Sequence, residues 1–247
     1  MKRSILAVLI LLAGCSSKTV LTRLDPTITA ADLRQGKVAV LGVVKAEEAD
    51  QVRPPLIAML EKTWREERSD VPLVSADSVR LALGPARDKD LLLGYEYHGK
   101  LEASALGEIA NSLRGLTRYV IVARVEKDKT WNVTRGISTK DTTSAAHVLY
   151  AMGVTGRDAW VVVQLYDLTR RALVVGARFK GSTENQHPMI DPRFARSGII
   201  LPKATADERG YPEMPDLALA VEQPFRDFAR ILPGSTKAPS APLAKKG

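Results

Sequence analysis

Short runs of valine-rich apolar residues constrain the fold of this 247-residue chain more than any other feature. Lys37–Val44 and Tyr119–Ala123 contain almost no polar residue between their first and last positions. A run of this length without alternating polar residues suits a β-strand that is covered on both faces. The two runs therefore predict strands inside a sheet, with further structure packed on it.

Helical segments are expected between and after these strands. Residues 53–68 bring Leu56 and Trp64 to one face at the spacing of an α-helix, after a proline pair that suits a helix start. Comparable spacing predicts a helix over residues 216–232, which Pro224 would kink. Three further helices are predicted: from a cap at Ser75 or Asp77 to Leu83, over residues 90–97 and over residues 104–114.

The second half of the sheet is expected to be an antiparallel meander. Ala159–Asp167 and Ala172–Gly181 form the clearest hairpin, because a short polar connection joins two apolar strands. Thr143–Val154 is a further predicted strand. The strand that begins at Tyr119 continues as Arg124–Asp128, where one face turns polar, as in a strand that leaves a core and projects. The prediction is an α/β (or α+β) fold, with a mixed sheet of about five or six strands and helices packed on it.

The first fifteen residues point to export. Met1-Lys2-Arg3 is a basic start, and Ile5–Leu12 is an apolar run without charge. A membrane-spanning helix needs about 20 apolar residues, so this run is too short to span a bilayer and instead suits a secretory signal. An ordinary signal peptide with an unrelated cysteine and a buried N-terminal helix are the alternatives.

The run ends in Leu12-Ala13-Gly14-Cys15 followed by Ser16, which resembles a bacterial lipobox. The resemblance implies cleavage before Cys15, lipidation of its thiol and acylation of the new amino terminus. Ser16, rather than Asp, after the cysteine implies the outer membrane and its periplasmic face. Several acyl chains on one residue would make the anchor effectively permanent, because each buried CH₂ group contributes about 0.8 kcal/mol.

The domain organisation is expected to follow these patterns. After a signal peptide over residues 1–14, residues 15–35 hold the lipidated cysteine and a tether to a single globular domain over residues 36–232. Within this domain, residues 183–215 contain five prolines and predict an irregular excursion, a kind of segment that usually carries function or an interface. Residues 233–247 carry three lysines and no acidic residue, which predicts a disordered basic tail.

No motif identifies a reaction. Gly94–Leu101 approaches the phosphate-binding loop pattern, but Leu101 stands where the magnesium-binding Ser or Thr should be, so a helix end and a turn are the preferred interpretation. His98, His147 and His187 are widely separated and have no nearby sequence partner. We expect a protein that is not an enzyme and that has no catalytic residues, no metal site and no cofactor.

Charged and aromatic residues supply candidate contact positions. The formal net charge is +8. Arg170-Arg171 at a hairpin tip and Lys245-Lys246 in the tail could contact anionic groups of the cell envelope, although loop tips and chain ends collect solvated charges in most proteins. Tyr95, Tyr97 and Trp131 would belong either to a contact surface or to the core. Nucleic acid is not expected as a partner in the periplasm.

Several hydrophobic motifs carry a family resemblance. Leu91-Leu92-Leu93-Gly94-Tyr95 is followed by Gly99-Lys100-Leu101, by Arg118–Val125 and by a strand that ends in Tyr166-Asp167-Leu168. Over residues 37–181 the chain resembles the periplasmic lipoproteins that share a fold with the curli-secretion lipoprotein CsgG, the N-terminal domain of TolB and the penicillin-binding-protein activator LpoB. The resemblance implies a binding or assembly module without catalytic residues. The sequence shows no long amphipathic hairpin pair of the pore-forming kind.

The sequence therefore predicts an outer-membrane lipoprotein, anchored through Cys15, whose domain binds another envelope protein in peptidoglycan synthesis or in secretion or export. One alternative is a structural component that forms a ring around a secretion or polysaccharide-export channel, which would make the protein a homo-oligomer. A less favoured alternative is a hydrolase of envelope polymers, which would need two acidic side chains that converge in a cleft.

Overall fold

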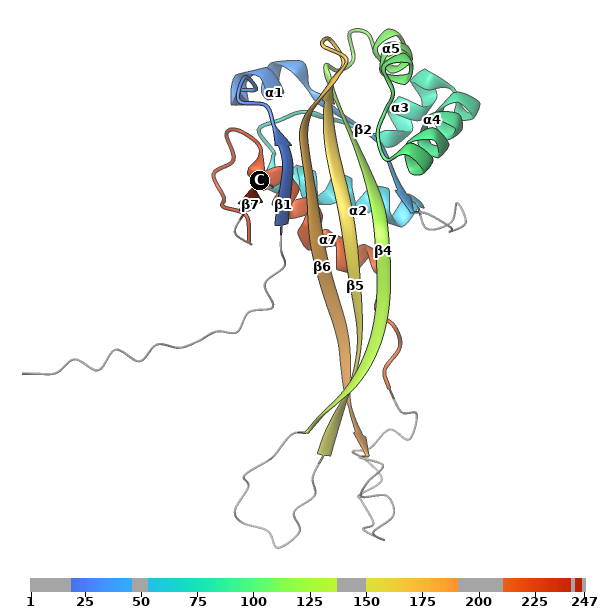
Figure 1. The fold of residues 1–247 in the computed structure, drawn as a ribbon, viewed down its shortest axis with the longest axis vertical. Helices are drawn as coiled ribbons and strands as arrows, with labels where there is room; N and C mark the ends of the chain where they lie inside the picture. The colour runs from blue at the N-terminus through green and yellow to red at the C-terminus, as the bar shows by residue number, and fades with distance from the viewer. Residues whose placement is uncertain (1–18, 46–52, 137–149, 191–210, 241–242, 246–247) are drawn as a thin grey trace, which may run out of the picture.

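The computed structural model describes residues 19–45, 53–136, 150–190, 211–240 and 243–245. It contains a head, in which helices lie around a sheet, and three long strands that extend away from the head (Figure 1). We call this extension the β-arm and define it as residues 127–136, 150–160 and 180–190, which pair with one another across three strands.

One mixed sheet runs through the head in the strand order β3-β2-β4-β5-β6-β1-β7. Strand β2 is parallel to β3 and β4, whereas β4, β5 and β6 form an antiparallel meander and β1 is antiparallel to β6. The predicted fold class is confirmed, and the very short β3 and β7 bring the sheet to seven strands. The strands are β1 (Thr19–Leu24), β2 (Val38–Lys45), β3 (Leu73–Val74), β4 (Tyr119–Gly136), β5 (Tyr150–Asp167), β6 (Ala172–Ile190) and β7 (Leu243–Lys245).

Local sequence signals set the helix ends. The Ser75 side chain accepts a hydrogen bond from a backbone N–H in the first turn of α3. Gly84 ends α3, Pro85 starts α4, and Gly99 ends α4 in the left-handed region at φ +69°. Gly94–Leu101 is therefore the end of a helix and a turn, as the sequence favours. The described helices are α1 (Ala30–Gly36), α2 (Arg53–Glu67), α3 (Ala76–Leu83), α4 (Pro85–His98), α5 (Ala103–Ser112) and α7 (Leu217–Ile231).

Two hydrophobic cores lie on opposite faces of the sheet in the head. Helices α1, α2 and α7 cover the first core, to which Trp64 and Phe228 contribute. Helices α3, α4 and α5 cover the second core, which contains Tyr95. Alternate residues of β2 enter the two cores, Val40 the first and Leu41 the second. This arrangement confirms that the valine-rich run Lys37–Val44 is a strand covered on both faces.

Helix α7 packs directly on the backbone of β6 at Gly181. A Cβ atom at this position would lie 1.9 Å from the carbonyl oxygen of Ala220 and 2.8 Å from the ring of Pro224. Pro224 has no N–H to donate to the Ala220 carbonyl one turn earlier in the helix. The Ala220 carbonyl, which Pro224 leaves without its usual partner in the helix, is thus the group that contacts β6. Gly181 gives this carbonyl room because it has no side chain.

Glu67, the last residue of α2, joins this helix to α7. Its carboxylate accepts hydrogen bonds from Arg226 at 2.9 Å and from Arg230 at 3.0 Å, and it lies 3.1 Å from Lys237 Nζ. The side chain is only 1% exposed. The hydrogen bond from Arg230, together with those from Lys237 and Arg226, outweighs burial and lowers the pKa of Glu67 to about 2.

The replacement Glu67→Gln should lower the free energy of unfolding by about 2 kcal/mol at pH 7. Because the pKa of this carboxyl is lower in the folded chain than its ordinary value of 4.5, its contribution is complete well above that value and is lost as the pH falls towards about 2. Urea unfolding of both proteins should therefore show a difference at pH 7 that shrinks at about pH 3.5. A difference that does not change with pH would contradict this assignment.

Several predicted boundaries are wrong. The predicted tether over residues 15–35 contains β1 and all of α1 except its last residue. Strand β1 is held by pairing with β6, and Thr29 caps α1 through reciprocal hydrogen bonds with Asp32. Neither interaction produces the apolar periodicity on which the prediction depended. The predicted disordered tail over residues 233–247 contains β7, which pairs in parallel with β1.

The three long strands are the largest departure from the prediction. The predicted irregular excursion over residues 183–215 begins inside β6, because residues 183–190 pair with β5 through the backbone despite their polar side chains. Thr143–Val154 contributes its second half to the longer strand β5, while residues 143–149 lie outside the described part. The sequence did not reveal that β4, β5 and β6 are long antiparallel strands, of 18, 18 and 19 residues. No described helix is long and apolar enough to cross a membrane.

Candidate functional site

The two faces of the β-arm differ. The first face is the side of the sheet on which α7 packs in the head. Residues 211–216, which precede α7, lie against the strands on this face. Thr155 of β5 donates a hydrogen bond to the carbonyl of Pro212 at 2.7 Å, and Asn185 of β6 donates one to the carbonyl of Glu213 at 2.9 Å. This first face is therefore covered by the segment that leads into α7.

Trp160 lies between two lysines on the second face. The Lys127 ammonium is 5.1 Å and the Lys180 ammonium 5.2 Å from its ring centroid, and the three residues are register neighbours on β4, β5 and β6. Asp158 pairs with Lys180 at 2.8 Å. Burial acts to raise the pKa of Asp158, but its hydrogen bond from Lys180 contributes to holding it below the ordinary value. These contacts fix a tryptophan in a surface of mixed charge.

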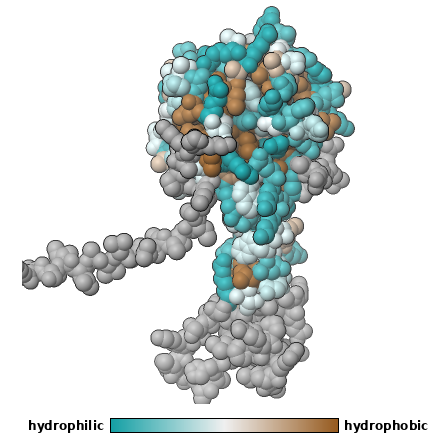
Figure 2. All heavy atoms as spheres, viewed as in Figure 1, coloured by the Kyte–Doolittle hydropathy of each residue, from teal (hydrophilic) through white to brown (hydrophobic). Residues whose placement is uncertain are grey.

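Trp131 continues this face towards the tip. Its indole lies so close to Gly156 that a Cβ there would come within 2.1 Å of the ring. Lys129 and Val133, on the same face of β4, are exposed. We call the surface formed by Lys127, Lys129, Trp131, Val133, Asp158, Trp160 and Lys180 the open face. It holds two of the three tryptophans of the chain, and Figure 2 shows the arm as a narrow, mainly hydrophilic stalk below the head.

Asp128 fastens the β-arm to the head. Lys45 Nζ at the end of β2 lies 2.6 Å from its carboxylate and Arg157 Nη2 of β5 lies 2.5 Å from it, and all three side chains are 10–11% exposed. Burial acts to raise the pKa of Asp128, but the hydrogen bonds from Arg157 and Lys45 outweigh it and hold the pKa below its ordinary value. Arg157 also donates to the carbonyl of Pro215 at 3.1 Å. Side chains from three strands therefore meet at one carboxylate, and Arg157 links them to the segment that precedes α7.

The outer edges of the β-arm have no paired strand among the described residues. Strand β2 pairs with β4 only as far as Val125, and β1 pairs with β6 only from Val175 to Arg178. An unpaired edge presents N–H and C=O groups to which another strand can add. Each edge is about ten residues long, which corresponds to roughly 33 Å.

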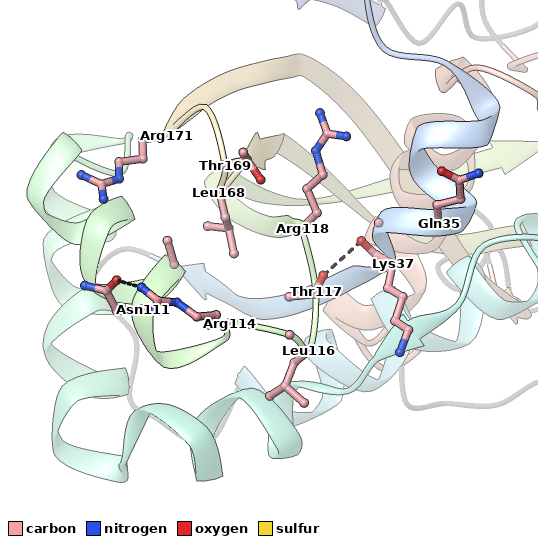
Figure 3. A pocket seen from close by; sticks show the side chains of 13 residues that line it. Gln35, Lys37, Asn111, Arg114, Leu116, Thr117, Arg118, Leu168, Thr169 and Arg171 are labelled. Atoms are coloured by element: carbon pink, nitrogen blue, oxygen red, sulfur yellow. Dashed lines mark hydrogen bonds between the residues drawn. The ribbon is translucent and has the colours of Figure 1, made fainter.

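A hollow of about 480 Å³ lies at the other end of the head, beside the β5–β6 turn (Figure 3). Its floor is tied together by a hydrogen bond from Thr117 Oγ1 to the carbonyl of Lys37 at 3.0 Å and by one from the Arg118 N–H to the carbonyl of Gly36 at 2.6 Å. Arg118 pairs with the buried Asp167 at 2.8 Å, and this hydrogen bond raises the pKa of Arg118.

Another hollow, of about 590 Å³, bears on the hydrolase alternative because Glu61, Asp77 and Asp88 line it. Glu61 accepts from Arg65 and from the backbone N–H of Ala76, and Asp77 pairs with Arg80. Burial raises the pKa of Asp88. Two of these three carboxylates thus accept from cationic or N–H donors within the described part of the chain.

The other candidate residues from the sequence do not gather at one place. Tyr95 is buried in the second core, whereas Tyr97 on the same helix is exposed and makes an edge contact with His98 at 5.0 Å between ring centroids. Trp131 alone of the three candidate aromatic residues lies on the β-arm.

The two candidate arginines at the hairpin tip have different surroundings. Arg170 pairs with Asp25 at 2.9 Å, while Arg171 lines the hollow beside the turn. His187 lies on β6 in the β-arm and Lys245 lies in β7. Three candidates fall outside the described residues: Cys15, His147 and Lys246.

The sequence did not single out Lys127, Trp160 and Lys180 as one cluster. These residues are separated along the chain, and cross-strand register alone brings them together. The alternation of side chains along β5 does place Trp160 on one face of the sheet. It does not reveal which residues of β4 and β6 lie beside Trp160 on that face.

No protein-family model and no curated protein matches this chain. Solved structures similar to it include a PelC dodecamer from Paraburkholderia phytofirmans, with 16% identity, a TM-score of 0.33 and coverage of 68% of this chain and 82% of that one. The LpoB C-terminal domain from Salmonella enterica has 13% identity, a TM-score of 0.36 and coverage of 64% and 87%. Lipoprotein GNA1162 from Neisseria meningitidis has 10% identity, a TM-score of 0.29 and coverage of 66% and 90%. LpoB is one of the proteins whose fold the sequence motifs resemble, and the likeness concerns the fold alone.

Proposed function

We propose that this protein is a lipoprotein of the outer membrane, anchored at the periplasmic face through Cys15. Its domain acts as a non-catalytic module that binds another envelope protein through the open face of the β-arm. The lipobox-like sequence at Leu12–Cys15 supports the anchor. The open face is the observation that carries the binding role.

Two properties of the open face support this role. Trp131 and Trp160 give it large, rigid, amphipathic rings, the side chains that contribute most often to binding energy at protein interfaces. Lys127, Lys129 and Lys180 surround these rings with positive charge. The two acidic residues of this face, Asp158 and Glu184, are each paired with a cation, Lys180 and Arg135. The partner that fits this face is a protein surface that combines apolar and acidic side chains.

Site-specific photo-crosslinking in intact cells tests the binding role. A photo-reactive amino acid in place of Lys129, on the open face, should trap a specific envelope protein. The same amino acid in place of Lys62, on the exposed side of α2 in the head, is the matched control and should not trap it. Equal crosslinking from both positions, or no envelope partner from Lys129, would count against the proposal.

The anchor has its own test. Protein isolated from the native host should begin at Cys15, carry acyl chains on this residue and fractionate with the outer membrane, whereas Cys15→Ser should lose all incorporation of a palmitate analogue. The change is all or none because Cys15 is the single cysteine of the chain. Finding an unmodified thiol with residues 1–14 still attached would refute the anchor while leaving the crosslinking result to be judged separately.

The unpaired edges of the β-arm favour a second candidate function, a ring-forming structural component. If the β4 edge of one copy pairs with the β6 edge of the next, each copy uses two different surfaces, and such head-to-tail contacts close into rings when the rotation permits. Native mass measurement of the full-length protein in detergent separates the two functions. A closed multimer of defined size would favour the ring, and a monomer would argue against it.

A further inference from the structure

The hollow beside the β5–β6 turn is lined by basic and neutral residues only. Its described lining includes Lys37, Arg114, Arg118 and Arg171 and contains no Asp or Glu. Figure 3 shows Arg114 and Arg171 on the side of α5, with Lys37 on the side of α1 and Thr117 between the two sides. The four basic residues are therefore distributed over two opposite sides of the hollow.

Among the described residues, three of these four cations have no carboxylate within ion-pair distance. Arg118 is neutralised by Asp167 at 2.8 Å and by Asp32 at 3.3 Å. Arg114 donates to the side-chain oxygen of Asn111, a neutral group, at 3.2 Å. Within the described part of the chain, no carboxylate lies within ion-pair distance of Lys37, Arg114 or Arg171, and these three side chains are exposed. Like charges brought together without a counter-charge repel one another, so an anion placed between them would be bound favourably.

Two of these cations stand at unusual backbone positions. Lys37, at φ +55°, and Arg171, at φ +49°, are the two described non-glycine residues with positive φ, and both line this hollow. Such a conformation costs about 1–3 kcal/mol when it lies outside the favoured regions, and it is found most often at ligand sites and turns. At Lys37 the carbonyl is held by the hydroxyl of Thr117 and by the N–H of Tyr119, so the framework imposes this conformation. Two cationic side chains are thereby placed at the rim.

We propose that this hollow binds a compact polyanion that carries a diphosphate group. Guanidinium groups match phosphate oxygens through paired N–H donors, and a lysine adds a mobile point charge. Because the basic residues lie on two sides of the hollow, a ligand with two linked anionic groups can contact more of them than a single carboxylate can. The volume of about 480 Å³ leaves room for a small group esterified to the diphosphate. This site does not depend on the β-arm or on the proposed partner protein.

Calorimetric titration with inorganic pyrophosphate tests the proposal on the full-length protein in neutral detergent. Saturable binding is expected, and it should weaken at least about tenfold when Lys37, Arg114 and Arg171 are all replaced by Gln, because charged hydrogen bonds of this kind each account for about that factor. The matched control replaces Arg23, Lys62 and Lys89, exposed residues outside the hollow, by Gln. It removes the same charge and should change the affinity by less than about twofold.

Vesicles distinguish the two sources of a diphosphate. The same proteins are mixed with neutral vesicles and with vesicles that contain a polyprenyl diphosphate lipid. Binding to pyrophosphate alone assigns a soluble diphosphate ester, and binding to the diphosphate vesicles assigns a lipid headgroup. Absence of binding to both probes would overturn the proposal. Equal weakening in the Lys37/Arg114/Arg171 variant and in its charge-matched control would also overturn it, because binding would then follow net charge alone. Thermal melting of each variant confirms that it is folded.

Discussion

Replacing Gly181 by alanine should destabilise the protein by about 3 kcal/mol, because a core that receives extra atoms must shift its backbone or strain its side chains. The new methyl group would lie 1.9 Å from the Ala220 carbonyl oxygen. This obstacle is the backbone of α7 and not the end of a flexible side chain, so relief requires α7 to move away from β6. Denaturant unfolding of the two proteins under identical conditions measures the loss.

Gly94→Ala is the matched control for this substitution. Gly94 lies inside α4, and a Cβ atom there would meet no atom within 4 Å. The same chemical change should therefore stabilise the protein by about 0.5–1 kcal/mol through helix propensity. Opposite signs for the two variants are expected. If Gly181→Ala proved as harmless as Gly94→Ala, the close packing of α7 on β6 would be wrong.

Asp128→Ala should have the next largest effect, a loss of about 3 kcal/mol in the free energy of unfolding at neutral pH. The substitution takes the shared carboxylate away from Lys45 and Arg157, two cations that are 10–11% exposed. Removing one partner of a largely buried ion pair costs far more than removing one from the surface, because the remaining charge has lost its access to water. Thermal and urea unfolding of the full-length protein measure this loss.

Asp77→Ala provides the comparison at the surface. Asp77 pairs with Arg80 at 3.2 Å, but its side chain is 89% exposed. Water and salt screen such a pair, so its removal should cost less than about 1 kcal/mol. Similar losses in both variants would show that Asp128 contributes no more than an ordinary surface charge and does not hold the root of the β-arm.

The head could be predicted from the sequence because its elements carry their own apolar patterns. Residues 53–68 and 216–232 were predicted as helices from the spacing of their apolar side chains, and α2 and α7 occupy almost the same ranges. Lys37–Val44 was predicted as a doubly covered strand, and its residues enter both cores. In each case the side chains that face the core must be apolar, so the spacing of apolar residues in the sequence indicates the secondary structure.

The β-arm could be predicted only at its root. The polar face that begins at Arg124–Asp128 correctly indicated a strand that projects from the core. Beyond that point few side chains of β4 and β6 are buried, and backbone pairing with β5 holds them in place. Every residue type can accept a backbone hydrogen bond and every type except proline can donate one, so these bonds leave little trace in the sequence. The cluster around Trp160 depends on this pairing and was missed for the same reason.

If Cys15 is acylated as proposed, the position of β1 limits how far the domain can stand from a bilayer. Cys15 precedes Thr19, the first residue of β1, by four positions, and an extended chain spans about 3.5 Å per residue. An acylated Cys15 would therefore keep the start of β1 within about 14 Å of the membrane surface. Val20 pairs with Arg178, two residues from the root of the β-arm at Lys180. An anchor at Cys15 would thus lie close to the base of the arm. The length of the sheet, and not that of a long linker, would then determine which envelope proteins come within range.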